Sequence, residues 1–225
     1  MHPSLSPLGW FDDPPVTSVR SVSPRVGEAR SYGRAAATPM TRHRMLVIRG
    51  QNFELATSDD VYTQTSRRTR LSNLTMLQPQ PLVIRAESDL DTALSKPMDI
   101  LQVWAHCGPT HTRFSEDAVY ETAVLARLIA QRVSRLAVII GCRSGALGRA
   151  LAERGVEAVV AMRVEVYSRT IQSLVTDLIS LALDGVPIDM AFAEALRSYV
   201  LTGQPGAAAV PMLYLSAGSD GKLFG

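Results

Sequence analysis

The sequence predicts an α/β domain with a mostly parallel central sheet and helices on both faces of that sheet. Short apolar runs rich in β-branched residues alternate along the chain with amphipathic segments of helical period. Strands that alternate with helices form βαβ crossovers, which place the strands parallel and cover the sheet on both sides. Strands buried on both faces consist of continuous apolar residues, as the runs in this chain do.

Composition limits the kind of protein. The chain has 225 residues, of which 46% are hydrophobic and 20% charged, and its formal net charge is +2. So small a charge gives no reason to expect nucleic-acid binding, and the apolar runs are far shorter than the roughly 18 residues of a membrane span. Two cysteines are too few for a disulfide framework, and the first residues show neither a basic leader nor an apolar core. We therefore expect a cytoplasmic protein with a soluble partner.

Residues 1–44 differ in character from residues 45–225. The first segment is rich in Pro, Ser, Gly and Arg and has neither helical nor strand period, which predicts a poorly ordered N-terminal tail. Its surplus of arginine would suit an acidic partner, but a solvated leader explains it as well. The second segment alternates between strand and helix patterns, so it is predicted to form the folded domain.

The strands are predicted from apolar runs, and the helices from apolar residues spaced three or four apart. The predicted strands are residues 45–49, 81–84, 100–104, 136–140, 158–162 and 212–215. The predicted helices are residues 89–95, 118–133, 146–154, 169–183 and 189–201. Gly155 and Gly185 stand where the third and fourth of these helices should end. The chain has no internal repeats.

Two of the predicted strands end in reactive side chains. His106 closes the run before Cys107, and Cys142 follows the run that ends at Ile140. In an open parallel sheet, ligands bind outside the carboxyl ends of the strands, so these side chains are candidates for one site. The connection after His106 is longer than a tight turn requires, and we expect its polar residues to cover or shape that site: His111, Arg113, Glu116 and Asp117.

A thiol and an imidazole at one sheet edge suffice for acyl transfer. A free thiol with a pKa of about 8.5 is only a few per cent thiolate at neutral pH, so a nucleophilic cysteine needs assistance. For Cys142, the candidate base is His106, and the helix beginning near Ala146 would place its N-terminus nearby. We therefore expect Cys142 to be the nucleophile and His106 to protonate the leaving amine.

Further groups must bind the oxyanion and orient the imidazole. We expect backbone N–H groups at Gly141 and Cys142, together with one from the Cys107-Gly108 turn, to stabilise the tetrahedral oxyanion, with Gly108 as the candidate in that turn. Asp99 cannot orient His106, because it lies seven residues earlier on the same strand, about 23 Å away at roughly 3.3 Å per residue. The predicted catalytic group is therefore a dyad.

Other motifs are incomplete. The glycine-rich loop that begins at Gly141 lacks both the G-x-G-x-x-G spacing of a dinucleotide site and the lysine of a P-loop. A G-x-S-x-G elbow would need its nucleophile at Arg143. His106 and Cys107 are adjacent on a strand and point to opposite faces, so they do not form a metal site. We expect no metal and no cofactor, and we expect apolar packing to raise the pKa of the Cys107 thiol.

Four stretches between residues 81 and 215 form an ordered set of motifs. They are Asp99-Ile100-Leu101-Gln102-Val103-Trp104-Ala105-His106, Ile139-Ile140-Gly141-Cys142-Arg143-Ser144-Gly145, Leu151-Ala152-Glu153-Arg154-Gly155-Val156-Glu157-Ala158-Val159-Val160-Ala161-Met162, and Pro211-Met212-Leu213-Tyr214-Leu215. In this order they resemble the CHAT family, bacterial cysteine peptidases related to caspases and separase. The first two resemble the segments that deliver the family's catalytic histidine and cysteine. The family usually has Gly directly after the histidine and an acid after the third stretch, where this chain has Cys107 and Ser168.

The resemblance implies a caspase-like three-layer fold and a cysteine endopeptidase with a protein or peptide substrate. CHAT peptidases are often joined to domains that recognise a trigger, so a separate activating or sensor protein is an implied partner. The alternative is a catalytically inactive module that keeps the fold in order to bind a partner. A small-molecule binder that uses the glycine-rich loop is a third hypothesis, which nucleotide-dependent stabilisation would favour.

A third strand end suggests the residue preference of such a peptidase. Glu165 follows the strand that ends at Met162 and would pair with a basic side chain of the substrate. Arg163, on the opposite face of that strand, would favour an acidic side chain. We expect Arg or Lys before the scissile bond.

Overall fold

A mostly parallel sheet forms the centre of the computed structural model, which describes residues 20–22, 42–51, 74–76, 81–164, 168–201 and 210–224. Its four inner strands are parallel and lie in the order β10 (Ala158–Met162), β9 (Val133–Ile140), β5 (Met98–Trp104) and β2 (His43–Gly50). Both β3 (Leu74–Met76) and β4 (Leu82–Ile84) pair with β2 in parallel. On the other side, β11 (Pro211–Leu215) is antiparallel to β10. The predicted parallel α/β sheet is confirmed.

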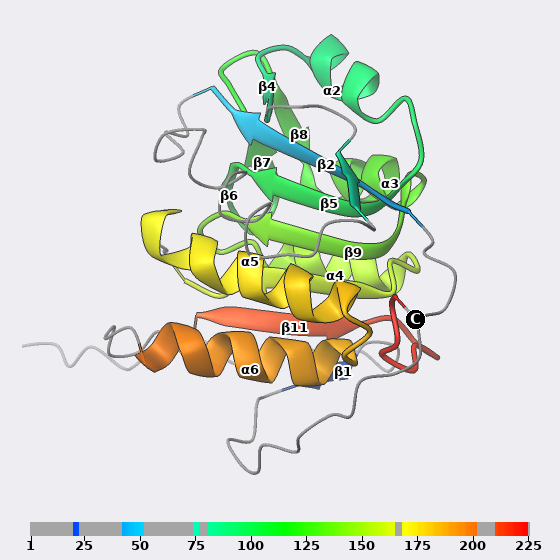
Figure 1. Cartoon of the computed structure of the whole chain (residues 1–225). Coiled ribbons are helices and arrows are strands. Elements are labelled where there is room, and N and C mark those ends of the chain that lie inside the picture. Colours follow the sequence, from blue (N-terminus) through cyan, green and yellow to red (C-terminus); the bar gives the residue numbers. More distant parts are fainter. Residues whose placement is uncertain are drawn as a thin grey trace, which may run out of the picture.

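Helices cover both faces of this sheet and create two separate apolar cores (Figure 1). One core contains α5 (Ser168–Leu183) and α6 (Ile188–Leu201), and the other contains α2 (Glu87–Ala93), α3 (Thr122–Ala130) and α4 (Gly145–Glu153). Along β9, Val138 and Ile140 face the first core, whereas Ala137 and Ile139 face the second. This alternation explains why the middle of β9, from Leu136 to Ile140, is apolar at every position.

A small antiparallel sheet occupies the region where the sequence predicts a loop. It consists of β6 (His106–Cys107), β7 (His111–Arg113) and β8 (Val119–Glu121). The helix expected over residues 118–133 therefore begins only at Thr122, and it ends at Ala130. Cys107, Thr112 and Tyr120 are cross-strand neighbours on the face turned to the core. Because their packing across the strands stabilises a sheet, residues 119–121 form a strand and not the first turn of the predicted helix.

The segment predicted to be an N-terminal tail contributes to the sheet at two places. Residues 20–22 form β1 (Arg20–Val22), which pairs antiparallel with β11, and β2 begins at His43, inside the predicted tail. His43 is buried, and its ring lies 4.6 Å from that of Phe224 in an edge-on arrangement. The rest of residues 1–41 lies outside the described residues. Among the helices that the structure describes, none has the length and apolar character to cross a membrane.

Candidate active site

The carboxyl ends of β5 and β9 meet in matched register. Trp104 and Ile140 are cross-strand partners, and the N–H of Ala105 donates to the carbonyl oxygen of Ile140 at 3.3 Å. His106, at the start of β6, and Cys142, in the turn after β9, each follow these partners by two residues. His106 is exposed and Cys142 is half-buried. The structure thus brings the two predicted catalytic residues to the same edge of the sheet.

Gly141 is required by a close approach of two strand ends. A Cβ atom at this position would lie 2.3 Å from the carbonyl oxygen of Ala105 and 2.7 Å from Sγ of Cys107. Any side chain at residue 141 would push the Cys142 turn away from the strand that carries His106. The structure therefore gives this glycine a steric role that the sequence analysis did not include, beside the predicted contribution of its backbone to the oxyanion site.

Ser144 fixes the turn that carries Cys142. Its hydroxyl is buried, donates to the carbonyl oxygen of Ile139 at 3.2 Å and accepts the N–H of Met162 at 2.8 Å. One side chain thus ties the turn to the ends of both β9 and β10. Sequence reasoning did not identify Ser144. The available signal was a small hydroxyl residue between an apolar run and a helix, a position that favours side-chain bonds to backbone groups.

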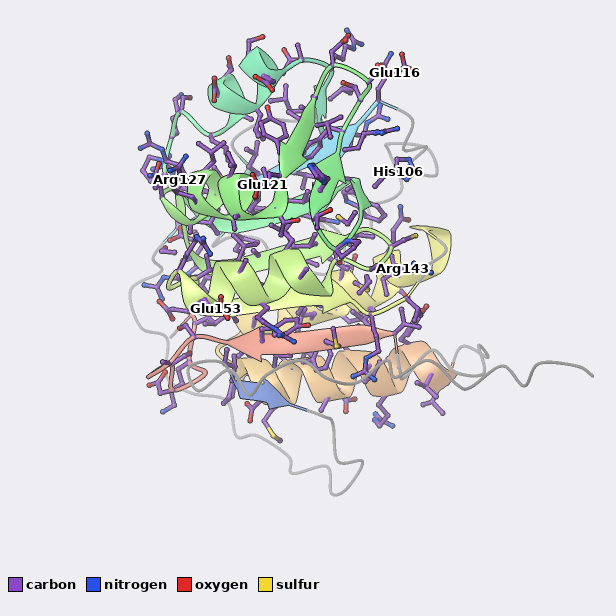
Figure 2. The ribbon with its side chains drawn as sticks, turned by 180° about the vertical axis from the view of Figure 1, so that it is seen from behind. His106, Glu116, Glu121, Arg127, Arg143 and Glu153 are labelled. Carbon is purple, nitrogen blue, oxygen red and sulfur yellow. The ribbon has the colours of Figure 1, made fainter. Side chains whose placement is uncertain are left out.

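Arg143 holds the turn in a left-handed backbone conformation, with φ of 56°. Among the residues that the structure describes, no other non-glycine residue has a positive φ. Its side chain is exposed, and it lies at the same edge of the molecule as His106 (Figure 2). Helix α4 begins at Gly145, so the unpaired N–H groups of its first turn follow directly after the Cys142 turn.

Cys107 faces away from the exposed side of its strand, as predicted. Its thiol accepts a hydrogen bond from the Thr112 hydroxyl at 3.8 Å and donates to the carbonyl oxygen of Ala105, also at 3.8 Å. Burial raises the pKa of Cys107 to about 12, the Thr112 hydrogen bond opposes this shift, and the charge of Cys142 adds to it. Cys107 is therefore a packing residue held as a neutral thiol.

The backbone N–H groups of Cys107 and Gly108, the two residues after His106, point to opposite sides of β6. Sequence analysis places an oxyanion donor at Gly108, but the N–H of Gly108 donates to the carbonyl oxygen of His111 at 2.8 Å within the hairpin. This N–H is therefore occupied. Hydrogen-bonded pairs alternate along an antiparallel ladder, so the N–H of Cys107 points away from β7. The sequence analysis expected a donor from the Cys107-Gly108 turn, and the ladder leaves the N–H of Cys107 as the one that is not used within the hairpin.

The predicted specificity residues lie away from the dyad or outside the described part. Nε of Arg163 donates to the sulfur of Met212 at 3.3 Å, and the N–H of Arg163 donates to the carbonyl oxygen of Val210 at 2.7 Å. Arg163 is therefore directed toward β11, on the side of β10 opposite to β9 and Cys142. Glu165 lies outside the residues that the structure describes.

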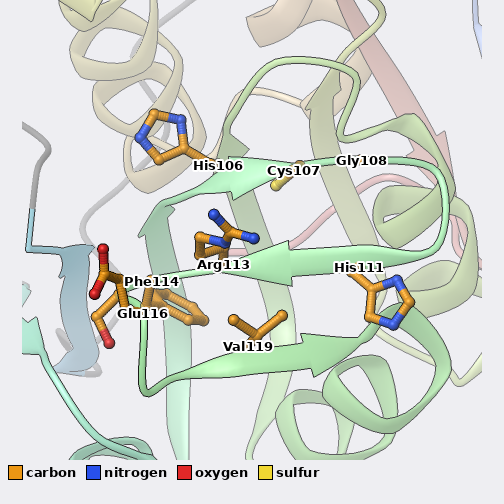
Figure 3. Close-up of a pocket in the computed structure, with 9 residues that line it drawn as sticks. His106, Cys107, Gly108, His111, Arg113, Phe114, Glu116 and Val119 are labelled. Carbon is orange, nitrogen blue, oxygen red and sulfur yellow. The ribbon is translucent and has the colours of Figure 1, made fainter.

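An open pocket of about 720 Å³ lies over the exposed face of the small sheet (Figure 3). Three of the polar residues predicted to shape the site line it: His111, Arg113 and Glu116. The fourth, Asp117, does not line the pocket, and its backbone forms an isolated parallel β-bridge with Ala86. Sequence reasoning did not identify Phe114, Ser115 and Val119 as pocket residues. The full lining is His106, Cys107, Gly108, His111, Arg113, Phe114, Ser115, Glu116 and Val119.

Asp99 has a structural role at the opposite end of β5. Its carboxylate accepts the N–H of Arg44 at 2.8 Å and lies 3.9 Å from Nδ1 of His43 and 3.8 Å from Nε of Arg135. The prediction that Asp99 does not orient His106 is therefore confirmed. Within the described ranges, no three His, Cys, Asp or Glu side chains are grouped closely enough to hold a metal ion.

Comparisons with known proteins give a distant structural similarity. No family model matches the chain, and no curated protein matches it by sequence. Among solved structures, the chain is similar to gingipain R, described as an Arg-specific cysteine proteinase, with 10% sequence identity and a TM-score of 0.49. The similarity covers 73% of this chain and 43% of the proteinase chain. The chain thus spans less than half the length of that proteinase.

Proposed function

We propose that the chain is a cysteine endopeptidase of the caspase-like type, related to the CHAT peptidases, with Cys142 as nucleophile and His106 as general acid and base. The observation that carries this proposal is the register of β5 and β9, in which Trp104 pairs with Ile140 and the two reactive side chains each follow by two residues. The sequence motifs quoted above support the same two residues.

The proposed reaction begins with transfer of the Cys142 thiol proton to His106. The sulfur attacks the carbonyl carbon of the scissile peptide bond, and the resulting oxyanion accepts hydrogen bonds from the backbone N–H groups of Cys142 and Cys107. His106 gives its proton to the leaving amine, and the C–N bond breaks to leave a thioester. His106 then takes a proton from water, which attacks the thioester, releases the acid and restores the thiol.

Two structural features support this assignment of donors. The N–H of Cys107 points away from β7 by the alternation of the β6–β7 ladder, whereas the N–H of Gly108 is bonded to His111. The turn at Cys142 is held at short range from β5 because Gly141 has no side chain and Ser144 ties it to two strands. A site whose donors are fixed before the substrate binds needs little rearrangement in the transition state.

Both cysteines are free thiols, which suits a reducing compartment such as the cytoplasm. The substrate we propose is a protein or peptide, and a separate activating or sensor protein is a proposed partner. The competing hypothesis is an interaction module of the same fold, in which His106 and Cys142 lie at the same positions but do not catalyse peptide cleavage.

Covalent labelling distinguishes these two hypotheses. A peptide that carries an electrophilic carbonyl or chloromethyl ketone should form an adduct on Cys142, found by tryptic mass spectrometry. His106→Ala should slow this labelling strongly, while Cys107→Ser serves as the matched control and should leave it nearly unchanged. Equal labelling of wild type and His106→Ala would count against the dyad and favour the interaction module.

A further inference from the structure

The pocket lies on the histidine side of the proposed dyad. It is lined by His106 and by residues of the small sheet, and no residue of the Cys142 turn contributes to it. His106, Arg113 and Val119 are cross-strand neighbours on three successive strands and share the exposed face of the sheet. Figure 3 shows Arg113 on the central strand, between His106 on one side and Val119 on the other.

The position beside the histidine determines which part of a substrate the pocket accepts. In the proposed reaction the sulfur bonds to the carbonyl carbon, and the imidazole protonates the amine that leaves. The chain that follows the scissile bond therefore lies next to His106, while the chain that precedes it lies on the side of Cys142. The pocket thus belongs to the leaving-group side, and this step rests on the proposed function.

Arg113 is the charged residue of the pocket lining that pairs directly with His106 across the small sheet. The two residues are register partners, and the Cα atoms of such partners are about 5.5 Å apart in a hydrogen-bonded pair. Arg113 is exposed and makes no ion pair with any residue in the described ranges. Glu116, the acid in the pocket lining, follows the end of β7 and is drawn beside Phe114 in Figure 3.

We infer that Arg113 is a specificity-determining residue that binds a carboxylate on the leaving-group side of the scissile bond. A guanidinium binds a carboxylate through two parallel hydrogen bonds, which fixes both position and orientation. Val119, the exposed register partner of Arg113 on β8, supplies apolar surface beside it, against which the stem of an acidic side chain packs. The carboxylate comes either from an Asp or Glu side chain or from the C-terminus of a short product-side segment.

Four peptides separate these two sources. All share one sequence before the scissile bond, and they carry either Glu or Gln after it, each with a free or an amidated C-terminus. The expected result is that wild type prefers Glu over Gln, or the free acid over the amide, by about 10- to 100-fold in kcat/KM. Arg113→Glu should abolish the preference, and peptides with Lys in place of Glu should then be favoured.

Arg127→Glu is the matched control for this charge reversal. Arg127 is exposed on α3 and lies at the opposite edge of the molecule from His106 (Figure 2). Reversing its charge should leave the preference unchanged. If cleavage by wild type proceeds without any dependence on the carboxylate, or if Arg113→Glu keeps the preference of wild type, the role of Arg113 is overturned while the peptidase function stands.

Binding of the same peptides to the Cys142→Ala variant tests the inference apart from catalysis. Fluorescence anisotropy should show tighter binding of the carboxylate peptides than of their neutral partners, and Arg113→Glu in the same background should remove the difference. This result would support the role of Arg113 even if wild type cleaved none of the peptides, an outcome that counts against the peptidase. Equal binding of all four peptides would overturn the inference.

Discussion

Sγ of Cys107 occupies the space that a side chain at Gly141 would need, at 2.7 Å from the position of a Cβ atom. The carbonyl oxygen of Ala105 lies still closer to that position, at 2.3 Å, and it belongs to the backbone. Both neighbours resist displacement, because the Cys107 thiol is hydrogen-bonded to Ala105 and Thr112 and the carbonyl of Ala105 belongs to the chain that leads to His106. The close approach of the ends of β5 and β9 thus depends on residue 141 being a glycine.

Gly141→Ala should therefore damage both stability and activity. Overpacking of this kind costs about 1–3 kcal/mol in the free energy of unfolding, and it displaces the Cys142 turn from His106. Gly108→Ala is the matched control, since its Cβ would lie 3.5 Å from the nearest atom, the carbonyl oxygen of His111. Urea unfolding and peptidase assays check both variants, and equal effects at the two positions would contradict the packing argument.

Loss of either member of the dyad should abolish turnover. Because nucleophile and proton carrier act as a unit, Cys142→Ala and His106→Ala should each reduce kcat to background while the circular dichroism spectrum stays that of wild type. Cys107→Ser should keep most of the activity. The assay is cleavage of a denatured-protein or peptide-library substrate, and undiminished turnover by Cys142→Ala would rule out the assignment.

The two thiols should differ in their rate of alkylation. Burial raises the pKa of Cys107 to about 12, so at pH 7 this thiol is almost entirely protonated. Iodoacetamide at about pH 7 should therefore modify Cys142 well before Cys107, as followed by mass spectrometry of the native protein. Cys107 labelled first would make the His106–Cys107 turn the candidate catalytic centre.

The same thiol should make stability fall at alkaline pH. The pKa of Cys107 rises from an ordinary value of 9.0 to about 12, so between these values the folded chain keeps a proton that the unfolded chain has lost. Its contribution is fully present below about pH 9 and decreases by at most roughly 1.4 kcal/mol per pH unit above it. Cys107→Ala should show a shallower alkaline decline in urea unfolding than wild type, and parallel curves would refute this origin.

Ser144→Ala should weaken the site through the backbone that it holds. The substitution leaves the N–H of Met162 buried without its acceptor, which costs about 1–3 kcal/mol, and it frees the turn from both β9 and β10. We expect a lower unfolding midpoint together with a reduced kcat. Ser134→Ala, at an exposed position, is the control and should change neither quantity.

The central sheet could be predicted because a strand buried on both faces needs apolar residues at successive positions, and such runs are visible in the sequence. The run from Leu136 to Ile140 serves two cores at once, and no loop or amphipathic helix has that pattern. The position of His106 and Cys142 at one edge of the sheet follows from the same runs, since parallel strands bring their carboxyl ends together.

The small sheet could not be predicted in the same way. Its strands have two or three residues each, too few for a periodic signal, and their partners are set by tertiary packing of Thr112 and Tyr120. The turn at Gly108-Pro109 was the one local indication of a hairpin. Because this sheet supplies the pocket, the sequence predicted the two residues of the proposed dyad but not the surface of the pocket beside them.

Strand β1 changes the edge that the main sheet presents beside β11. Its residues, Arg20 to Val22, pair with Leu213 to Leu215 along the outer side of β11. Without them β11 would expose a row of unsatisfied backbone donors and acceptors, which is a template for adding a strand from another molecule. A segment whose composition resembles a leader thus replaces the edge of the five-residue strand β11 with that of a three-residue strand, and removing it would favour edge-to-edge aggregation.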